Sequence, residues 1–340
     1  MATIEKAIIV KSKTRLELLT EQYNTVQQAQ FAIERKRENL EVQSNFLSKE
    51  SLKSVTGNRK KKMKDVGSGE FSDFDKAHKQ QYTVLEMVQN ITAKHLKVKV
   101  IDNTFLPSFI FSENDLIIVV GQDGLVANTA KYTNNLPIIG VNPDASRFDG
   151  ILLPFNAQTF EQALWNVLKG NYNHKLVTMA EVLLDDGQRL LAFNDLFIGP
   201  NSHTSARYLI THQDITETHS SSGIIISTGA GATGWMSSLF NMANGIHQAF
   251  GGKQICERPK VPWDTEQLIF IVREPFISKT SQAQISAGII TPQNELVVES
   301  LMEKTGIIFS DGIEADKLRF NSGSIAKIGI AKEKAKLVLP

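Results

Sequence analysis

The sequence predicts an α/β domain with a parallel sheet, followed by a mostly antiparallel β-sandwich domain, with the functional site in the cleft between them. An apolar strand without polar alternation, residues 115–120, runs into the turn Gly121-Gln122-Asp123-Gly124, as in sheets buried on both faces. Strands alternate with helices up to residue 148, and later strands follow one another through turns. We expect an α/β domain over 1–148, a β-sandwich over 149–312 and a C-terminal segment, 313–340, that returns to the first domain.

Composition supports two domains with a substantial core, since the chain has 340 residues and is 41% hydrophobic. The net charge of +1 predicts no nucleic-acid or membrane partner. The single cysteine, Cys256, excludes an internal disulfide, and the seven scattered histidines show no metal-ligand spacing. The apolar run 7–10 is too short for a signal or a membrane span. We therefore expect a cytoplasmic protein without a structural metal.

Hydrophobic periodicity defines the elements of the first domain. We predict strands over 6–11, 96–101 and 136–141 beside the strand over 115–120, and helices over 14–40, 74–95 and 126–132. The stretch 51–74 combines glycines with the basic cluster Arg59 to Lys64 and predicts a mobile surface loop. A solvated surface is the first interpretation of that cluster, and binding of phosphates or an acidic partner is the alternative.

The second domain begins with a predicted helix over 159–169, capped by Thr159 and Gln162 in a capping box. Asp185-Asp186-Gly187 predicts a hairpin. Further strands are predicted over 181–184, 189–193, 206–211, 223–228, 267–273, 284–290, 295–299, 325–330 and 336–339.

Three segments carry candidate functional residues. Gly121 and Gly124 allow backbone amides to approach an anion, and Asp123 places a carboxylate beside them, at the edge where α/β proteins bind ligands. An ordinary strand-to-helix turn is the alternative. In the second segment, Ser227 to Trp235, small residues expose the backbone to a flat ring or a phosphate, and Thr228 and Thr233 supply hydroxyls.

The spacing Gly229-x-Gly231-x-x-Gly234 also satisfies a dinucleotide-binding fingerprint, but no strand ending in an acid follows it. A turn made for close packing is the other alternative. The third segment, Asn194-Asp195, combines an amide and a carboxylate where an apolar strand ends, which suits ribose hydroxyls or an adenine edge.

Taken in order, these segments resemble the NAD kinase family, over about 115–312. Gly121-Gln122-Asp123-Gly124-Leu125 resembles the family's Gly-Gly-Asp-Gly-Thr, and Gly140-Val141-Asn142 its Gly-Val-Asn turn. Asn194-Asp195 resembles its Asn-Glu pair, and Ser227 to Trp235 its Ser-Thr-Pro-Thr-Gly-Ser-Thr-Ala-Tyr-like loop. The stretches 141–154 and 193–208 look most like the mitochondrial-type branch.

The resemblance implies transfer of the terminal phosphoryl group of ATP, with Mg²⁺, to the 2′-hydroxyl of the adenosine ribose of NAD, giving NADP, in a homodimer or homotetramer. It implies Asp123 as general base and Gly121, Gln122 and Gly124 as the phosphate turn. The NAD-binding residues it implies are Asn194, Asp195, Thr228, Thr233, Gly234 and Trp235.

Several positions depart from the family pattern. Gln122 replaces a glycine, where a left-handed backbone would cost on the order of 1 kcal/mol or more. Leu125 removes a threonine hydroxyl, and Asp195 is one methylene shorter than glutamate. The alternative is therefore a related protein that binds nucleotide but is catalytically weak, or that phosphorylates a lipid or a sugar.

Overall fold

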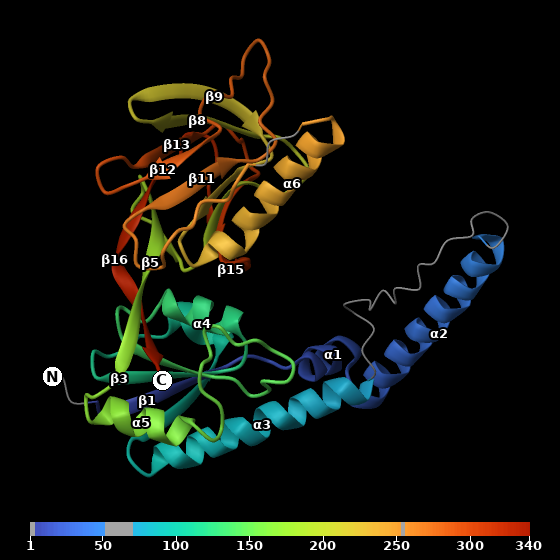
Figure 1. The fold of residues 1–340 in the computed structure, drawn as a ribbon, viewed down its shortest axis with the longest axis vertical. Coiled ribbons are helices and arrows are strands. Elements are labelled where there is room, and N and C mark those ends of the chain that lie inside the picture. The colour runs from blue at the N-terminus through green and yellow to red at the C-terminus, as the bar shows by residue number, and fades with distance from the viewer. Residues whose placement is uncertain (1–3, 52–70, 253–255) are drawn as a thin grey trace.

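A computed structural model describes residues 4–51, 71–252 and 256–340. It consists of two domains joined by two long strands, β5 (Asn173–Leu184) and β16 (Ile325–Leu339) (Figure 1). The basic cluster Arg59 to Lys64 lies outside the described residues. The predicted α/β and β-sandwich architecture is confirmed.

The first domain is built on a parallel sheet in the order β2-β1-β3-β4. Strand β3 is buried along its whole length, as its uninterrupted apolar sequence predicts. Strands β2 and β3 lie on opposite sides of β1, because the chain adds β2 on one side and then crosses to add β3 on the other. The direction in which strands are added to the sheet therefore reverses between β1 and β3. The crevice beyond the carboxyl ends of these two strands is where open α/β sheets bind ligands. The bounds are β1 (Lys6–Lys11), β2 (Lys97–Asp102), β3 (Asp115–Val120) and β4 (Pro137–Val141).

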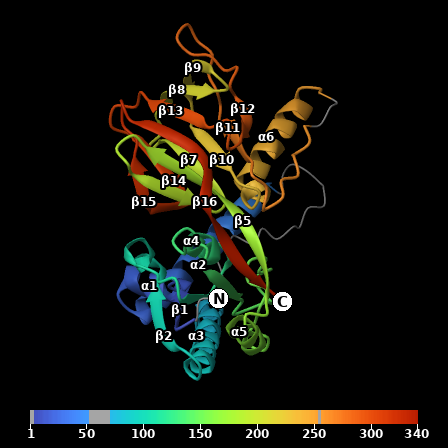
Figure 2. The same ribbon diagram turned by 90° about the vertical axis from the view of Figure 1, so that its left-hand side faces the viewer.

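The helices of this domain cover both faces of its sheet, as Figure 2 shows. The single helix predicted over 14–40 is in fact two helices, because Asn24 adopts a left-handed conformation, φ 65°, and ends the first of them. The third helix begins at Phe71, inside the predicted loop. The bounds are α1 (Arg15–Tyr23), α2 (Val26–Ser51), α3 (Phe71–Ala93), the 3₁₀ helix η1 (Asn103–Ser108), α4 (Asp123–Ala130) and α5 (Phe160–Leu168).

Helix α5 packs on the first-domain sheet, since Phe160 and Leu164 share an apolar cluster with Ile9 and Val84. The predicted boundary at residue 148 assigned this helix to the second domain, whereas the chain leaves the first domain along β5. The predicted capping box is also wrong. Thr159 makes no side-chain cap; instead Asn156 Oδ1 accepts the Thr159 amide at 3.1 Å while the Asn156 amide donates to Thr159 Oγ1 at 3.0 Å.

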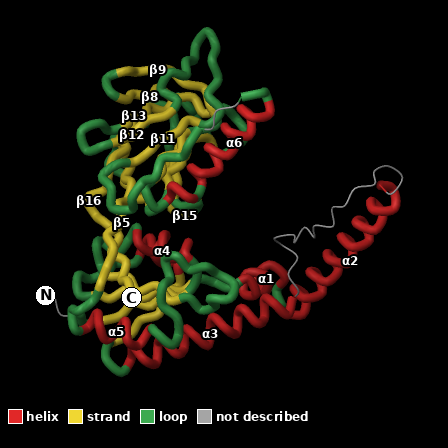
Figure 3. Tube along the Cα trace, viewed as in Figure 1, coloured by secondary structure: helices red, strands yellow, loops and turns green. Residues whose placement is uncertain are grey.

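The second domain is a sandwich whose two sheets enclose one apolar core. Figure 3 shows its strands above the first domain, with α6 (Trp235–Ala249) along one side. One sheet has the order β12-β11-β10-β7-β14-β15, and the other is formed by β16, β13, β8 and β9 with β5 and β6. The remaining bounds are β6 (Arg189–Ala192), β7 (Asp195–Pro200), β8 (Ala206–His212), β9 (Ile215–Ser221), β10 (Ile224–Ser227), the 3₁₀ helix η2 (Gly231–Thr233), β11 (Leu268–Val272), β12 (Ala287–Ile290), β13 (Leu296–Ser300), β14 (Gly306–Ser310) and β15 (Ile313–Arg319).

Strand β16 belongs to both domains. Its first part pairs with β13 of the sandwich, and its last part pairs in parallel with β4 of the first domain, at Lys336 and Leu337. Along almost its whole length, from Ala326 to Leu339, it also runs antiparallel to β5, with a register irregularity between Ile330 and Lys334. The domains therefore share one continuous sheet.

The cap of α5 gives a test of this local structure. Asn156→Ala removes an acceptor for amides at the start of the helix, so we expect the free energy of unfolding to fall by about 1 kcal/mol. Urea denaturation measures the change. Gln158→Ala, at an exposed neighbouring position, is the control and should leave stability unaltered. Equal effects of the two substitutions would contradict the assigned cap.

Candidate functional site

Asp123 is the first residue of α4, directly beyond the buried strand β3. Its Oδ1 accepts the backbone amide of Leu152 at 2.6 Å, which fixes the direction of a half-buried carboxylate. The Leu152 loop lies close because Gly140 has no side chain: a Cβ there would come within 2.2 Å of the Leu152 carbonyl oxygen.

The expected backbone strain at Gln122 is absent. Gln122 has φ −114° and ψ 164°, an ordinary extended conformation, and it occupies the N-cap of α4 without a side-chain cap. Gly121 and Gly124 do not use positive φ either. A Cβ at Gly124 would meet nothing within 4 Å, so the space beside this residue is open. The turn therefore presents the free amides of a helix N-terminus, an arrangement that suits an anion.

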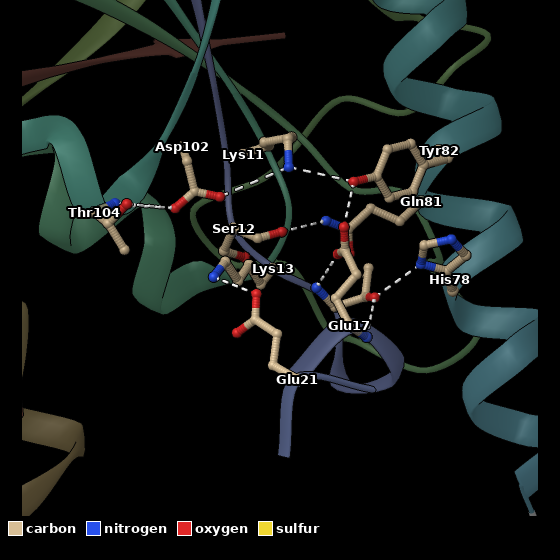
Figure 4. Close-up of polar contacts among 11 residues, drawn as sticks. Lys11, Ser12, Lys13, Glu17, Glu21, His78, Gln81, Tyr82, Asp102 and Thr104 are labelled. Atoms are coloured by element: carbon tan, nitrogen blue, oxygen red, sulfur yellow. Dashed lines mark hydrogen bonds and ion pairs between the residues drawn. The ribbon is translucent and has the colours of Figure 1, made fainter. Parts of the chain in front are cut away.

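A polar network fixes the neighbouring end of β1 (Figure 4). Lys11 Nζ donates to the Tyr82 hydroxyl at 3.2 Å, and that hydroxyl donates to Glu17 Oε1 at 2.6 Å. Burial alone would lower the pKa of Lys11, but the Tyr82 hydrogen bond and nearby carboxylates raise it overall. These contacts join β1, α1 and α3, and they hold the edge at which the strand order reverses. Sequence reasoning missed this network because its members are far apart in the chain.

The second and third motifs meet in a pocket of about 250 Å³ in the second domain. Asn194 and Asp195 both line it. Asn194 precedes β7 and Asp195 is its first residue, so the alternation of side chains along a strand does not separate them. The pocket is lined by Asn194, Asp195, Ala230, Gly231, Thr233, Gly234, Trp235, Asp311 and Gly312.

Thr228 supports the pocket from behind. Its hydroxyl donates to the Phe193 carbonyl at 2.6 Å and accepts the Gly231 amide at 3.2 Å, and its side chain is buried. Gly231 must be small, since a Cβ would lie 2.3 Å from the Asn194 carbonyl oxygen. Thr228 and Gly231 thereby bring the two motifs together.

The dinucleotide fingerprint suggested by the glycine spacing is not supported. Strand β10, which precedes the loop, pairs antiparallel with both β7 and β11, whereas that fingerprint requires a parallel βαβ unit. Gly229 is instead a close-packing position, where a Cβ would meet the Pro262 carbonyl oxygen at 2.1 Å.

Trp235 begins α6 at the mouth of the pocket. Its indole is stacked on Phe197, with centroids 5.6 Å apart, and the Arg273 guanidinium lies 5.6 Å from the ring centre. Phe197 and Arg273 of the protein itself therefore occupy part of the indole surface that could stack on a ligand ring.

Two acids meet at the floor of the pocket. Burial, together with the neighbouring Asp311 charge, raises the pKa of Asp195 to about 7, and Ser227 partly opposes this shift. Asp195 Oδ1 is buried without a hydrogen-bond partner among the described residues. Asp311 accepts the amides of Phe193, Asn194 and Asp195, which counter the effect of its burial, yet its pKa is still raised.

Asp311 is a site residue that sequence reasoning did not select. It forms, with Gly312, the two-residue turn between β14 and β15, with φ of 53° and 71°. An Asp-Gly pair between strands is a strong hairpin signal, and it was available in the sequence. The amide contacts of Asp311 are visible only in three dimensions.

The structure thus brings the Asn194-Asp195 pair and the glycine loop together in the second domain. The turn that contains Asp123 lies in the first domain. Asp123 is not among the residues that line the pocket; it lies on α4, whose other end contacts the second domain through Lys131 and Tyr132. Within the described ranges, no three His, Cys, Asp or Glu residues stand together as metal ligands. No helix in those ranges is long and apolar enough to cross a bilayer.

The Asp195 carboxyl predicts a pH-dependent stability. The pKa of an aspartate in an unfolded chain is about 3.9, and in the folded protein it is about 7. Between these values the unfolded chain loses a proton that the folded protein keeps, so stability falls as pH rises from about 4 to about 7. Asp195→Asn removes this loss, and the Tm of the variant relative to wild type should increase over this range and level off above it.

Calorimetry at several pH values measures that difference. Asp264→Asn, at an exposed position, should change Tm by the same small amount at every pH. An Asp195→Asn effect that does not vary with pH would show that this carboxyl titrates normally.

Comparisons with known proteins find curated NAD kinases among the relatives of this chain. No family model matches the chain. The chain is 27% identical over 158 residues to the NAD kinase of Saccharolobus islandicus (strain M.14.25 / Kamchatka #1), covering 46% of this chain and 57% of the relative. It is 30% identical over 157 residues to that of Buchnera aphidicola subsp. Baizongia pistaciae (44% and 52%), and 33% identical over 135 residues to that of Legionella pneumophila (strain Paris) (36% and 44%).

The chain spans about half the length of the curated relatives it matches. Among solved structures, yeast NADH kinase complexed with NADH has a TM-score of 0.54 and 15% identity, over 77% of this chain and 80% of that one, which shows a shared fold. None of these matches distinguishes the mitochondrial-type branch, which stays a prediction. In its ordered motifs, its sequence relatives and its two-domain fold, the chain is therefore similar to NAD kinases.

Proposed function

We propose that this protein transfers the terminal phosphoryl group of ATP to the 2′-hydroxyl of the adenosine ribose of NAD, forming NADP. The observation that carries the proposal is the position of Asp123, at the carboxyl end of a buried strand and in the first turn of α4. The names of the sequence relatives support the same activity.

In this proposal Asp123 is the general base. Its Oδ1 is held by the Leu152 amide at 2.6 Å, so the carboxylate has a defined direction. Oδ2 would accept the proton of the ribose hydroxyl as that oxygen attacks the terminal phosphorus, and the bond from phosphorus to the bridging oxygen of ADP would break. A base must lie within hydrogen-bond reach of the proton that it takes, so the acceptor ribose would sit against the start of α4.

The donor phosphates would lie on the turn formed by Gly121, Gln122 and Gly124. The open amides of the helix start favour negative charge. Mg²⁺ would arrive as the complex with ATP and neutralise charge on the transferring group. Since no three-carboxylate or histidine group stands among the described residues, the phosphates rather than a protein cage would supply most of its ligands.

The acceptor dinucleotide would occupy the second-domain pocket. Asn194 and Asp195 would contact hydroxyl or ring atoms, and Thr233, Gly234 and Trp235 would form the wall. Below a pH of about 7 the protonated form of the Asp195 carboxyl predominates, and this form can donate a hydrogen bond as well as accept one. Thr228 would not contact the dinucleotide itself, because its hydroxyl is hydrogen-bonded within the protein. It would hold the loop that contains Gly231 in place.

A second candidate is nucleotide binding with weak transfer, or transfer to a lipid or sugar acceptor. The side chain of Gln122 is exposed in the phosphate turn, and the side chain of Leu125 is buried where the family pattern has a threonine hydroxyl. The Gln122 side chain occupies space at the phosphate turn, and the Leu125 side chain lacks the hydroxyl that a donor phosphate could contact. Assays with ATP or polyphosphate as donor, and with NAD, NADH, a lipid or a sugar as acceptor, separate these cases.

We also propose a homo-oligomer, the state that the family resemblance implies. Met242, Ile246 and Phe250 are exposed along α6, and exposed apolar side chains grouped on one helix are typical of protein interfaces. Sedimentation analysis of the purified chain measures the subunit number.

The direct test of the catalytic role is Asp123→Asn. The amide cannot take the proton, so we expect kcat for NADP formation to fall by about 10² to 10⁴-fold, with the Tm and the affinity for NAD close to wild type. Glu113→Gln, the same acid-to-amide change at an exposed position before β3, is the control and should retain activity. An Asp123→Asn variant with wild-type kcat would refute the general-base role.

A further inference from the structure

We propose that Lys131 is a positioning residue that fixes Asp123 of the first domain relative to the nucleotide pocket of the second. The inference rests on the proposed function. Lys131 directly follows α4, the helix that Asp123 begins, and its side chain is only 1% exposed. A lysine is almost never buried to this degree unless it is paired.

The Lys131 ammonium reaches into the second domain. Its Nζ donates to Ser310 Oγ on β14 at 2.8 Å and lies 3.2 Å from Asp316 Oδ2 on β15. The Tyr132 hydroxyl donates a short hydrogen bond to the same Asp316 oxygen. Two consecutive side chains from the end of one helix therefore hold two strands of the other domain. We call these four residues the interdomain latch.

The latch connects to the pocket through two short steps. Ser310 immediately precedes Asp311, whose carboxylate accepts the amides of residues 193–195. The positive charge of Lys131 lowers the pKa of Asp311 against the raising effect of burial, so it favours the ionised form that accepts these bonds. Lys131 thereby stabilises the backbone segment from which Asn194 and Asp195 line the pocket.

The latch connects to Asp123 through α4. Lys131 comes eight positions after Asp123, a distance of about 12 Å along the helix at 1.5 Å per residue. A hydrogen-bonded helix is stiff over this length, so a displacement of Lys131 relative to the sandwich moves Asp123 as well. In Figure 1, α4 lies on the side of the first domain that faces the sandwich.

The other interdomain contacts do not fix this distance as sharply. The β5 and β16 strands form a narrow ribbon between the domains, with an irregular register between Ile330 and Lys334, and paired strands vary in twist. An apolar cluster also crosses the junction and includes Val126 and Phe193, but hydrophobic contact is non-directional. Paired hydrogen bonds to a charged group have defined geometry.

Transfer of a phosphoryl group is sensitive to such a position. A misplacement of about 1 Å can cost about 10²-fold in rate. The pocket is lined only by second-domain residues, so losing the latch should leave dinucleotide binding largely intact while separating the bound ribose from Asp123. The expected signature is a loss in kcat without a matching loss in affinity.

The experiment compares Lys131→Met with Lys131→Arg and with Lys6→Met. Lys6 also pairs with an aspartate of the first domain, Asp115, but at the amino end of the strands. We expect Lys131→Met to lower kcat by roughly 10 to 100-fold, with the Kd for NAD, from calorimetry, within about 3-fold of wild type. Lys131→Arg should recover most of the rate, and Lys6→Met should keep it. If Lys131→Met retains kcat, or loses rate only in proportion to affinity, the inference is wrong.

A second readout does not depend on activity. Spin labels at Ser108→Cys and Ile289→Cys, both exposed positions, in a Cys256→Ser background report the distance between domains. Lys131→Met should broaden the distance distribution, and Lys6→Met should not; unchanged distributions in both overturn the inference. If Lys131→Met does not fold, Ser310→Ala, which removes one latch acceptor, must show the same broadening to a smaller extent. A wild-type protein that makes no NADP from either donor would refute the proposed function, while the distances would still decide the role of Lys131.

Discussion

One strand that belongs to both domains is the constraint on which the rest of the structure depends. Strand β16 extends the parallel sheet beside β4 and then continues into the sandwich beside β13. Because its hydrogen bonds are made in both sheets, the domains cannot separate without breaking a ladder. Strand β16 enters the first domain beside the first residues of β4, Pro137 and Ile138, and α4 contacts the sandwich through Lys131 and Tyr132, so a strand and a helix both hold the junction between the domains.

The junction also concentrates charge. Asp195 begins β7, Asp311 lies in the turn before β15 and Asp316 lies within β15, and among the described residues the buried cation beside Asp311 and Asp316 is Lys131. Unpaired buried carboxylates are costly, and the protein limits this cost in different ways. Asp311 accepts hydrogen bonds from three backbone amides, and Asp316 pairs with Lys131 and accepts a hydrogen bond from Tyr132. Asp195 is mostly protonated below a pH of about 7. A pocket with one protonated acid can both donate to and accept from a nucleotide.

The sequence predicted the features that depend on local composition. The apolar run before Gly121 indicated a buried parallel strand, and the Asp185-Asp186-Gly187 turn indicated the β5–β6 hairpin. It did not predict the break at Asn24, because helical residues flank that position on both sides. Strands β7, β9, β14 and β15 were missed. Strand β7 pairs with β10 and β14, which are distant in the chain, whereas β9 and β15 are edge strands that each pair with the strand just before them.

For the site too, the sequence predicted the local motifs but not the contacts between distant segments. The sequence named Asn194, Asp195 and the glycine loop, and the structure brings them into one pocket, while their roles remain a proposal. It could not show that the Thr228 hydroxyl is engaged by the Phe193 carbonyl, or that Lys131 is buried against Asp316. Both facts depend on contacts between segments more than 30 residues apart, which no local pattern reports.

We propose that Asp123 and the second-domain pocket act on one bound dinucleotide. A crystal structure with NAD and a non-hydrolysable ATP analogue would test this proposal. We expect the adenosine ribose between the domains, with its 2′-oxygen within about 2.6–3.2 Å of an Asp123 carboxylate oxygen. A dinucleotide bound with that hydroxyl turned away from Asp123, or bound outside the junction, would contradict it.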